Sequence, residues 1–294
     1  MKTLLSINGG GLFGIGVANW LPKLTSKWNW KFDCYAGTSV GSILAACYAI
    51  GMTPSEVQEL FNSDLPEKMF TKKYITTKQF IKSAIYKTES AREALTSVFG
   101  NRKVSDVTNP LVIVAWNYSK SKEKVFSQTS NSSYLLRDAV LASMSAPTYF
   151  CPLKLEDDRG ELEQLGDGGV CGNDPSLAGI AAMLDFYKKQ RLSIQDIKCL
   201  SINTIGEPKE IKKEVKISSV ILSWIPVLTE AITSGNAAYT FYGISRIMGS
   251  NRYLRISPYG LPNDGRMDDF DLVSKIKKAW LKHPEQAALK FLKK

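Results

Sequence analysis

The sequence of 294 residues has only one histidine, His283, and its five cysteines form neither a CxxC pair nor a metal-ligand spacing. We therefore expect free thiols in a reducing compartment, a cytoplasmic protein and no metal ion. No uninterrupted apolar run reaches the roughly 18 residues that a membrane-spanning helix needs. The first residues, MKTLLSINGGG, pass from a short apolar run into glycines without a cleavage site, so we interpret them as a strand and not as a signal peptide.

Basic residues outnumber acidic ones, with 38 Lys and Arg against 28 Asp and Glu, which gives a formal net charge of +10. The simplest interpretation is a solvated basic surface, and the excess also favours contact with an anionic partner. The basic residues are scattered and form no basic-aromatic motif, so nucleic acid is not expected as a partner. An anionic lipid surface, met peripherally, is the alternative partner. The sequence predicts no oligomeric state.

Short apolar runs alternate with amphipathic stretches along the chain. The runs predict strands at residues 3–7, 32–36, 111–116, 124–126, 160–166, 197–203 and 252–256. The stretches between them predict helices at residues 14–21, 43–50, 53–101, 135–144, 175–190 and 270–292, with Pro22 kinking or ending the first. This alternation predicts an α/β fold with a mainly parallel sheet. No internal repeat or low-complexity linker divides the chain, so we expect one domain over residues 1–294.

A further apolar run at residues 217–232 is broken by Pro226. We interpret it as part of the core, because most apolar runs of this length are buried. An amphipathic lid that opens against a bilayer is the alternative interpretation.

Gly37-Thr38-Ser39-Val40-Gly41 is a GxSxG pattern between a predicted strand and a predicted helix. At such a junction a sharp turn holds the serine hydroxyl exposed above the sheet, as a nucleophile requires. The turn strains the backbone at Ser39 and brings neighbouring chain close, so bulky residues in place of Gly37 and Gly41 would clash. Ser39 is therefore the candidate nucleophile.

Residues 8–14, NGGGLFG, follow the first predicted strand and precede a helix. The glycines Gly9, Gly10, Gly11 and Gly14 expose backbone N–H groups there, and the helix N-terminus adds a favourable dipole. In an acyl transfer such a loop would hold the oxyanion of the tetrahedral intermediate. Two parallel strands at residues 3–7 and 32–36 would set the loop beside Ser39.

A serine nucleophile needs a base, which is usually a histidine. His283 lies in a Lys-rich helix directly before Pro284 and is expected to be exposed; a role as triad base is the alternative, because Ser, Asp, His is the chain order of hydrolases. A desolvated carboxylate can take the proton instead, since burial raises its pKa. Asp167 is the best candidate, because it ends a predicted strand and is followed by Gly168 and Gly169. An Asx-turn is the alternative interpretation of this Asp-Gly pair.

Taken together, the glycine loop, the serine turn and the aspartate segment resemble the patatin-like phospholipase family. Further similarity extends over nearly the whole chain, in residues 142–150, 200–204, 253–256 and 267–269. The resemblance implies a three-layer α/β/α fold and a Ser-Asp dyad that hydrolyses fatty acyl esters of phospholipids or related lipids without a cofactor. It also accounts for the missing histidine.

The resemblance assigns roles to the matching residues. Ser39 would be the nucleophile, Asp167 the general base, and the backbone amides of Gly10 and Gly11 the oxyanion donors. The family usually has a basic residue where Phe13 stands, so a side-chain contribution from this loop position is not expected. Asp167 would accept the Ser39 proton, and water would then hydrolyse the acyl-enzyme.

Two other functions are compatible with parts of this pattern. Residues 9–14 also fit GxGxxG after a strand, which is typical of dinucleotide sites. Such a site needs an acidic residue at the end of the next strand, whereas Asp33 stands at the beginning of that strand. The second alternative is a patatin-fold protein that is catalytically silent, or that an effector or partner switches on.

Overall fold

The computed structural model describes residues 1–25, 31–73, 84–130, 133–206, 224–261 and 268–293. Its strands are β1 (Lys2–Ile7), β2 (Cys34–Thr38), β3 (Leu111–Asn117), β4 (Lys122–Ser127), β5 (Leu153–Glu156), β6 (Leu162–Asp167), β7 (Ile197–Ile202) and β8 (Tyr253–Ile256). Its α-helices are α1 (Gly14–Thr25), α2 (Val40–Ala49), α3 (Pro54–Asn62), α4 (Leu65–Met69), α6 (Thr88–Phe99), α7 (Leu136–Ser143), α8 (Gly169–Gly172), α9 (Ser176–Phe186), α10 (Trp224–Met248), α11 (Val273–Lys282) and α12 (Gln286–Lys293).

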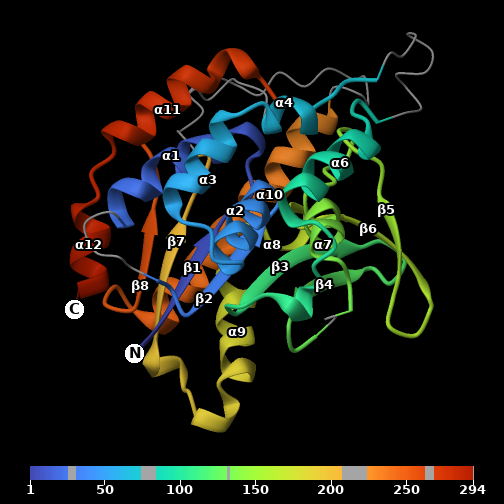
Figure 1. The fold of residues 1–294 in the computed structure, drawn as a ribbon. Helices are drawn as coiled ribbons and strands as arrows, with labels where there is room; N and C mark the ends of the chain where they lie inside the picture. Colours follow the sequence, from blue (N-terminus) through green and yellow to red (C-terminus); the bar gives the residue numbers. More distant parts are fainter. Residues whose placement is uncertain (26–30, 74–83, 131–132, 207–223, 262–267, 294) are drawn as a thin grey trace.

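The strands of the described residues form one sheet in the order β5-β6-β3-β2-β1-β7-β8, and β4 pairs with β3 (Figure 1). Pairs among β8, β7, β1, β2 and β3 are parallel, as β-α alternation requires. The remaining strands β4, β5 and β6 are joined antiparallel at one edge. The predicted α/β fold with a mainly parallel sheet is thus confirmed.

Helices cover both faces of this sheet, because successive residues of a strand point to opposite sides. Leu5 and Ile7 of β1 pack into the larger core, which α1, α2 and α11 cover. Leu4 of the same strand points into the smaller core, where Ile180 of α9 and Ile244 of α10 pack. Figure 1 shows α1 and α2 on one side of the sheet and α9 and α10 on the other. The fold therefore has the three layers expected.

Several helices differ from those predicted. The single helix predicted over residues 53–101 is wrong, because its described part forms α3, α4 and α6, and an antiparallel bridge between Lys72 and Tyr86 interrupts the helical chain between α4 and α6. Helix α1 does not end at Pro22 but continues to Thr25. The long C-terminal helix is in fact two helices, α11 and α12, because His283 precedes a proline and takes an extended backbone with ψ of 128°. The proline ring disfavours helical geometry in the residue before it, which explains the break. Strand β5 was not among the predicted strands.

The apolar run at residues 217–232 lies partly outside the described residues. Its described part begins α10, in which Pro226 stands in the first turn, where a helix tolerates proline. Leu228 and Ile232 are about half exposed, so the interpretation of this run as plain core is wrong for them. Within the described part of the chain, no helix combines the length and hydrophobicity needed to cross a membrane.

Candidate active site

Ser39 occupies a sharp turn between β2 and α2. Its φ of 52° lies in the left-handed region that a residue with a side chain rarely adopts, so the backbone here is strained. The turn is held on both sides: the Ser39 N–H donates to Oγ of Ser143 at 2.9 Å, and the N–H of Ser42 donates to the Ser39 carbonyl at 2.8 Å. Strain at a residue so firmly held is typical of functional sites.

Gly37 and Gly41 leave no room for a side chain at this turn. A Cβ on Gly37 would overlap the carbonyl oxygen of Gly41, and a Cβ on Gly41 would overlap the carbonyl oxygen of Ile7 at the end of β1. Both obstacles are backbone atoms, which cannot move aside without moving a strand. The turn therefore depends on glycine at both positions.

Strand pairing explains how Asp167 reaches Ser39 from a distant part of the chain. Because β4 pairs with β3 along residues 112–117, both β2 and β6 must lie along the other edge of β3. On that edge Thr38, the last residue of β2, pairs with Val114, and Asp167, the last residue of β6, pairs with the next residue, Ala115. The two strands therefore meet end to end, which brings Ser39 beside the Asp167 carboxylate, where its hydroxyl lowers the pKa of that carboxyl.

Asp167 is 5% exposed, and burial raises the pKa of its carboxyl from 3.8 to about 6. A hydrogen bond from the Gly169 N–H, at 2.6 Å, and the neighbouring Ser39 hydroxyl favour the ionised form and limit the rise in pKa. A carboxylate with such a pKa remains ionised near neutral pH, yet it is a better proton acceptor than an exposed carboxylate. The Gly169 bond is also the Asx-turn expected of an Asp-Gly pair, so this interpretation holds beside the contact with Ser39.

The glycine loop lies directly beside Ser39, since a Cβ on Gly9 would stand 3.1 Å from Cβ of Ser39. The N–H of Gly9 donates to the carbonyl of Asn173 at 3.2 Å, and the N–H of Gly14 donates to carbonyls of the 3₁₀ turn at residues 11–13. The N–H groups of these two glycines are therefore not free to bind an oxyanion, which reduces the four candidate oxyanion donors of the loop to two. For the N–H groups of Gly10 and Gly11, no acceptor is found among the described residues.

The Gly9–Gly10 peptide has a fixed direction. Its carbonyl oxygen, on Gly9, accepts a hydrogen bond from the hydroxyl of Thr204, which follows β7. Because a trans peptide is planar, its N–H, on Gly10, points the opposite way from that carbonyl. Thr204 thus orients a candidate oxyanion donor, a role that the sequence analysis did not assign to it.

The aspartate segment is tied to α10 by one side chain. Asn236 of α10 donates through Nδ2 to the carbonyl of Gly169 at 2.7 Å and accepts through Oδ1 from the N–H of Asn173 at 2.9 Å. The two bonds span α8, whose first residue also bonds to Asp167. Sequence analysis missed Asn236, because an asparagine in a helix carries no local signal of such a contact.

A buried ion pair anchors the segment at its other end. Asp174 accepts from Nη1 of Arg255 at 2.5 Å and from the hydroxyls of Ser201 and Tyr253, both at 3.1 Å. Ser176 bonds to the same carboxylate through its N–H at 3.0 Å. A charge removed from water needs such partners, and here they come from β7, β8 and the start of α9. The position of the Asp167 segment therefore depends on three parts of the fold.

His283 is not part of this constellation. It is 9% exposed and packs against the rings of Trp20, Trp280 and Tyr259, so the expectation of an exposed residue is wrong. Burial lowers the pKa of its imidazole, with Lys23 contributing as a like charge. In the part of the chain that the structure describes, the ring contacts of His283 are with these three aromatic side chains.

Other features bear on the alternative functions. Asp33 binds Lys2 at 2.8 Å and the N–H of Thr3 at 2.8 Å, at the amino edge of the sheet and away from the glycine loop. It therefore does not stand where a dinucleotide ribose would need it. In the part of the chain that the structure describes, no group of three or more His, Cys, Asp or Glu side chains could hold a metal ion.

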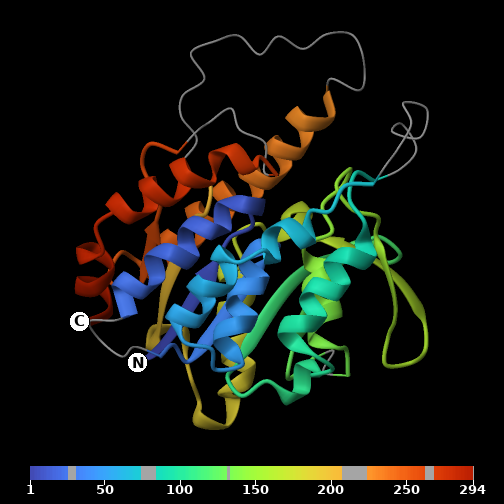
Figure 2. The same ribbon diagram turned by 45° about the horizontal axis from the view of Figure 1, so that its top comes forward.

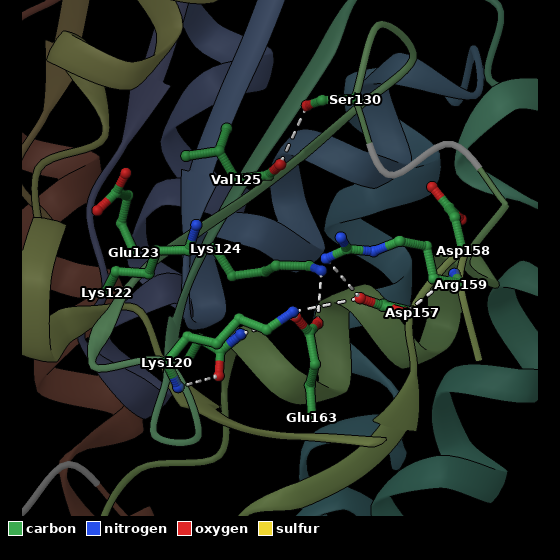
Figure 3. A pocket seen from close by; sticks show the side chains of 11 residues that line it. Lys120, Lys122, Glu123, Lys124, Val125, Ser130, Asp157, Asp158, Arg159 and Glu163 are labelled. Atoms are coloured by element: carbon green, nitrogen blue, oxygen red, sulfur yellow. Dashed lines mark hydrogen bonds and ion pairs between the residues drawn. The ribbon is translucent and has the colours of Figure 1, made fainter. Parts of the chain in front are cut away.

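A separate cavity of about 400 Å³ opens beside β4, and its lining is strongly charged. Lys120 and Lys124 both form ion pairs with Glu163, at 2.8 and 2.5 Å. Figure 3 shows their side chains directed at that carboxylate. Lys120 also contacts Asp157 at 3.2 Å. These cations are compensated by neighbouring carboxylates, so the cavity offers no excess positive charge to an anion.

Comparisons with known proteins show which proteins the chain resembles. The chain is 30% identical over 225 residues to a cGAMP-activated phospholipase of Escherichia coli (strain TW11681), covering 69% of this chain and 62% of that protein. It is 27% identical over 235 residues to a cGAMP-activated phospholipase of Vibrio cholerae (serotype O1, strain ATCC 39315 / El Tor Inaba N16961), covering 69% of this chain and 64% of that protein. The chain thus spans less than two thirds of the length of these relatives.

Among solved structures, VipD from Legionella pneumophila is similar over 94% of this chain and 66% of its own, with 14% identity and a TM-score of 0.48. The family model for patatin-like phospholipase matches residues 5–179, which include the glycine loop, the serine turn and the aspartate segment. Because this match covers more than half of its length, the chain belongs to the patatin-like phospholipase family.

Proposed function

We propose that this protein hydrolyses fatty acyl esters of lipids, with Ser39 as nucleophile and Asp167 as general base. The observation that carries the proposal is the position of Asp167, a buried carboxylate whose pKa burial raises to about 6, at the strand end that meets the turn of Ser39. A serine hydroxyl is a weak nucleophile unless an adjacent base takes its proton. The lipid substrate is inferred from membership of the phospholipase family.

The reaction follows from the roles of four residues. Oγ of Ser39 attacks the acyl carbonyl while its proton passes to Asp167, and the N–H groups of Gly10 and Gly11 stabilise the oxyanion that forms. Collapse of this intermediate breaks the ester bond, and the leaving alcohol takes the proton from Asp167. Water then gives a proton to Asp167 as it attacks the acyl-enzyme, and the fatty acid leaves as Ser39 regains its proton.

The substrate is expected to reside in a lipid surface that the protein meets from one side. The net charge of +10 favours anionic surfaces, because acidic headgroups attract basic residues near the bilayer. Vesicle hydrolysis should therefore rise with the fraction of anionic lipid at low ionic strength, and this rise should weaken as salt is added.

Control by a nucleotide effector is a second proposal, which the names of the relatives favour. Three of them are called cGAMP-activated phospholipases and a fourth a cUMP-AMP-activated phospholipase. We therefore expect hydrolysis by this chain to increase when a cyclic dinucleotide is added. Equal hydrolysis rates with and without cGAMP, cUMP-AMP and related compounds would contradict this second proposal and indicate a hydrolase that needs no effector.

The test of the hydrolase is covalent labelling with a fluorophosphonate lipid probe, followed by intact-mass and peptide analysis. Each reaction is run with and without mixed liposomes and cyclic dinucleotides. The variants are Ser39→Ala, Asp167→Asn and the control Ser55→Ala, which removes an exposed hydroxyl on α3. We expect one adduct at Ser39 in the wild type and in Ser55→Ala, no adduct in Ser39→Ala, and slow labelling in Asp167→Asn. An adduct elsewhere, or unchanged esterase activity in Ser39→Ala, would refute the dyad.

A further inference from the structure

Helix α10 carries a row of apolar and aromatic side chains on its outer face. The exposed fractions are 50% for Leu228, 48% for Ile232, 78% for Tyr239 and 56% for Tyr242. At 3.6 residues per turn these four positions fall on one side of the helix, along some four turns. We call them the α10 outer face. Large exposed apolar side chains gathered in one row are unusual on a protein surface and mark interaction sites.

The opposite side of the same helix is firmly packed. Ala237, Ile244 and Met248 are buried, and the last two pack against the smaller core. Asn236 adds the two hydrogen bonds to the aspartate segment. The helix is therefore held in place, and its outer face is a fixed surface of the molecule.

The outer face carries little charge. Between residues 227 and 248 the side chains that are charged at neutral pH are Glu230 and Arg246. Arg246 is exposed near the end of the row, with its guanidinium 3.8 Å from the centre of the Tyr242 ring. Tyrosine and arginine beside aliphatic side chains suit the boundary between lipid tails and headgroups, where one end of a side chain is apolar and the other is wet.

The outer face begins at the edge of the sheet where the candidate active site lies. Helix α10 leads into β8, which is parallel to β7, so the helix runs opposite to the parallel strands and starts at their carboxyl ends. Ser39 follows the carboxyl end of β2, and the glycine loop follows that of β1. Figure 2 shows the start of α10 projecting beyond the sheet at this edge. Leu228 and Ile232 lie in this first part.

We infer that the α10 outer face docks on an anionic lipid surface, with Leu228 and Ile232 inserted below the headgroups and Arg246 contacting acidic headgroups. This inference rests on the proposed function, since it supplies the surface through which the hydrolase reaches its substrate. The net charge of +10 favours an anionic lipid surface over a second copy of the chain, because two such copies repel one another. Docking also places α10, which hydrogen-bonds to the Asp167 segment, directly against the lipid that contains the substrate.

Binding is tested on the full chain with Ser39→Ala, so that lipid is not consumed. Vesicle flotation compares this protein with the same protein carrying Leu228→Gln and Ile232→Gln. The vesicles are made of phosphatidylcholine alone or of phosphatidylcholine in which about a quarter of the lipid is replaced by phosphatidylglycerol. Each buried aliphatic side chain is worth about a tenfold change in partition, so we expect binding to fall by at least about tenfold. The control carries Leu177→Gln and Leu281→Gln, which remove side chains that are 60% and 46% exposed on α9 and α11. Its binding is expected to stay unchanged.

The same two pairs of substitutions, made in the protein that keeps Ser39, separate membrane docking from catalysis. We expect the α10 pair to hydrolyse a soluble short-chain ester at the wild-type rate and vesicle lipid at least about tenfold more slowly. Equal vesicle binding of the α10 pair and the control pair would overturn the docking surface, whatever the esterase result. Loss of binding in the α10 pair would support the surface even if no form of the protein hydrolysed any ester. A wild-type dimer that the α10 pair converts to a monomer would assign the face to a second copy and refute the inference.

Discussion

Replacing Asp167 by asparagine should abolish activity and, at neutral pH, make the protein more stable. The carboxyl is buried and its pKa is raised from 3.8 to about 6, so the folded state disfavours the charge that the unfolded chain carries easily. Asparagine has nearly the same shape and no charge. The substitution therefore removes a cost that the wild type bears for keeping a buried base.

The size of this cost follows from the shift in pKa. A rise of roughly two units, at about 1.4 kcal/mol each, corresponds to about 3 kcal/mol at pH 7, where Asp167 is ionised in both states. Because its folded pKa is raised, the folded protein takes up the proton first as the pH falls, and the wild type regains this stability between pH 6 and pH 4. At pH 5 the difference between the two proteins should be about half as large. Asparagine interacts more weakly than an ionised carboxylate with the Gly169 N–H and the Ser39 hydroxyl, so the stability differences at both pH values will be somewhat smaller.

The assay is urea unfolding of wild type and Asp167→Asn at pH 7 and at pH 5, with hydrolysis of a soluble ester measured on the same samples. We expect Asp167→Asn to be more stable by about 1–3 kcal/mol at pH 7 and by less at pH 5. The account of Asp167 as a base whose buried charge destabilises the fold would be refuted if the variant were less stable than the wild type at pH 7. It would also be refuted if the stability difference did not become smaller from pH 7 to pH 5. Wild-type turnover in this variant would refute its catalytic role.

The remaining predictions concern the base, the oxyanion donor, the turn and the anchor. The kcat/KM for a soluble ester should fall about tenfold from pH 7 to pH 5, because the ionised fraction of a carboxyl with a pKa of about 6 falls in that ratio; a flat profile would contradict the role of Asp167. Thr204→Val should lower kcat about tenfold at constant KM, since the Gly10 N–H loses its orientation, and Thr204→Ser should restore it; equal kcat in both variants would refute the positioning role. Gly41→Ala should cost at least about 3 kcal/mol of folding stability because its Cβ meets backbone, whereas Gly235→Ala in α10, where a Cβ meets nothing, should stabilise by under about 1 kcal/mol in thermal melts. Arg255→Met should cost about 3–5 kcal/mol by the same measurement, because Asp174 is then left buried without its cation; a loss under about 1 kcal/mol would show that the hydroxyls suffice.

The sequence by itself determined those parts of the site whose requirements are local. The clash that excludes a side chain at Gly37 arises within one turn, so the five-residue pattern already contains it, whereas the clash at Gly41 is with Ile7 of the neighbouring strand β1. The alternation of apolar runs and amphipathic stretches likewise predicted most of the strands and the mainly parallel sheet, because hydrophobic periodicity is a property of neighbouring residues, but it missed β5 and the breaks within two long helices. Ser39 and Asp167 could be proposed on this basis.

Only the tertiary structure decided which groups meet and how they are solvated. The contact between Ser39 and Asp167 depends on β2 and β6 sharing one edge of β3, and a pairing register cannot be read from either strand alone. The same holds for the Gly9 N–H, which a carbonyl of the aspartate segment occupies, and for Asn236, which binds that segment from α10.

Burial was the other property that local pattern did not determine. A histidine beside lysines and a proline was expected to be exposed, but packing of α11 against α1 encloses His283 between aromatic rings. Leu228 and Ile232 show the opposite case, since an apolar run predicts core and yet these side chains lie outside. Hydrophobicity is a property of the residue, whereas exposure depends on which elements cover it, and that is decided when the layers of the fold assemble.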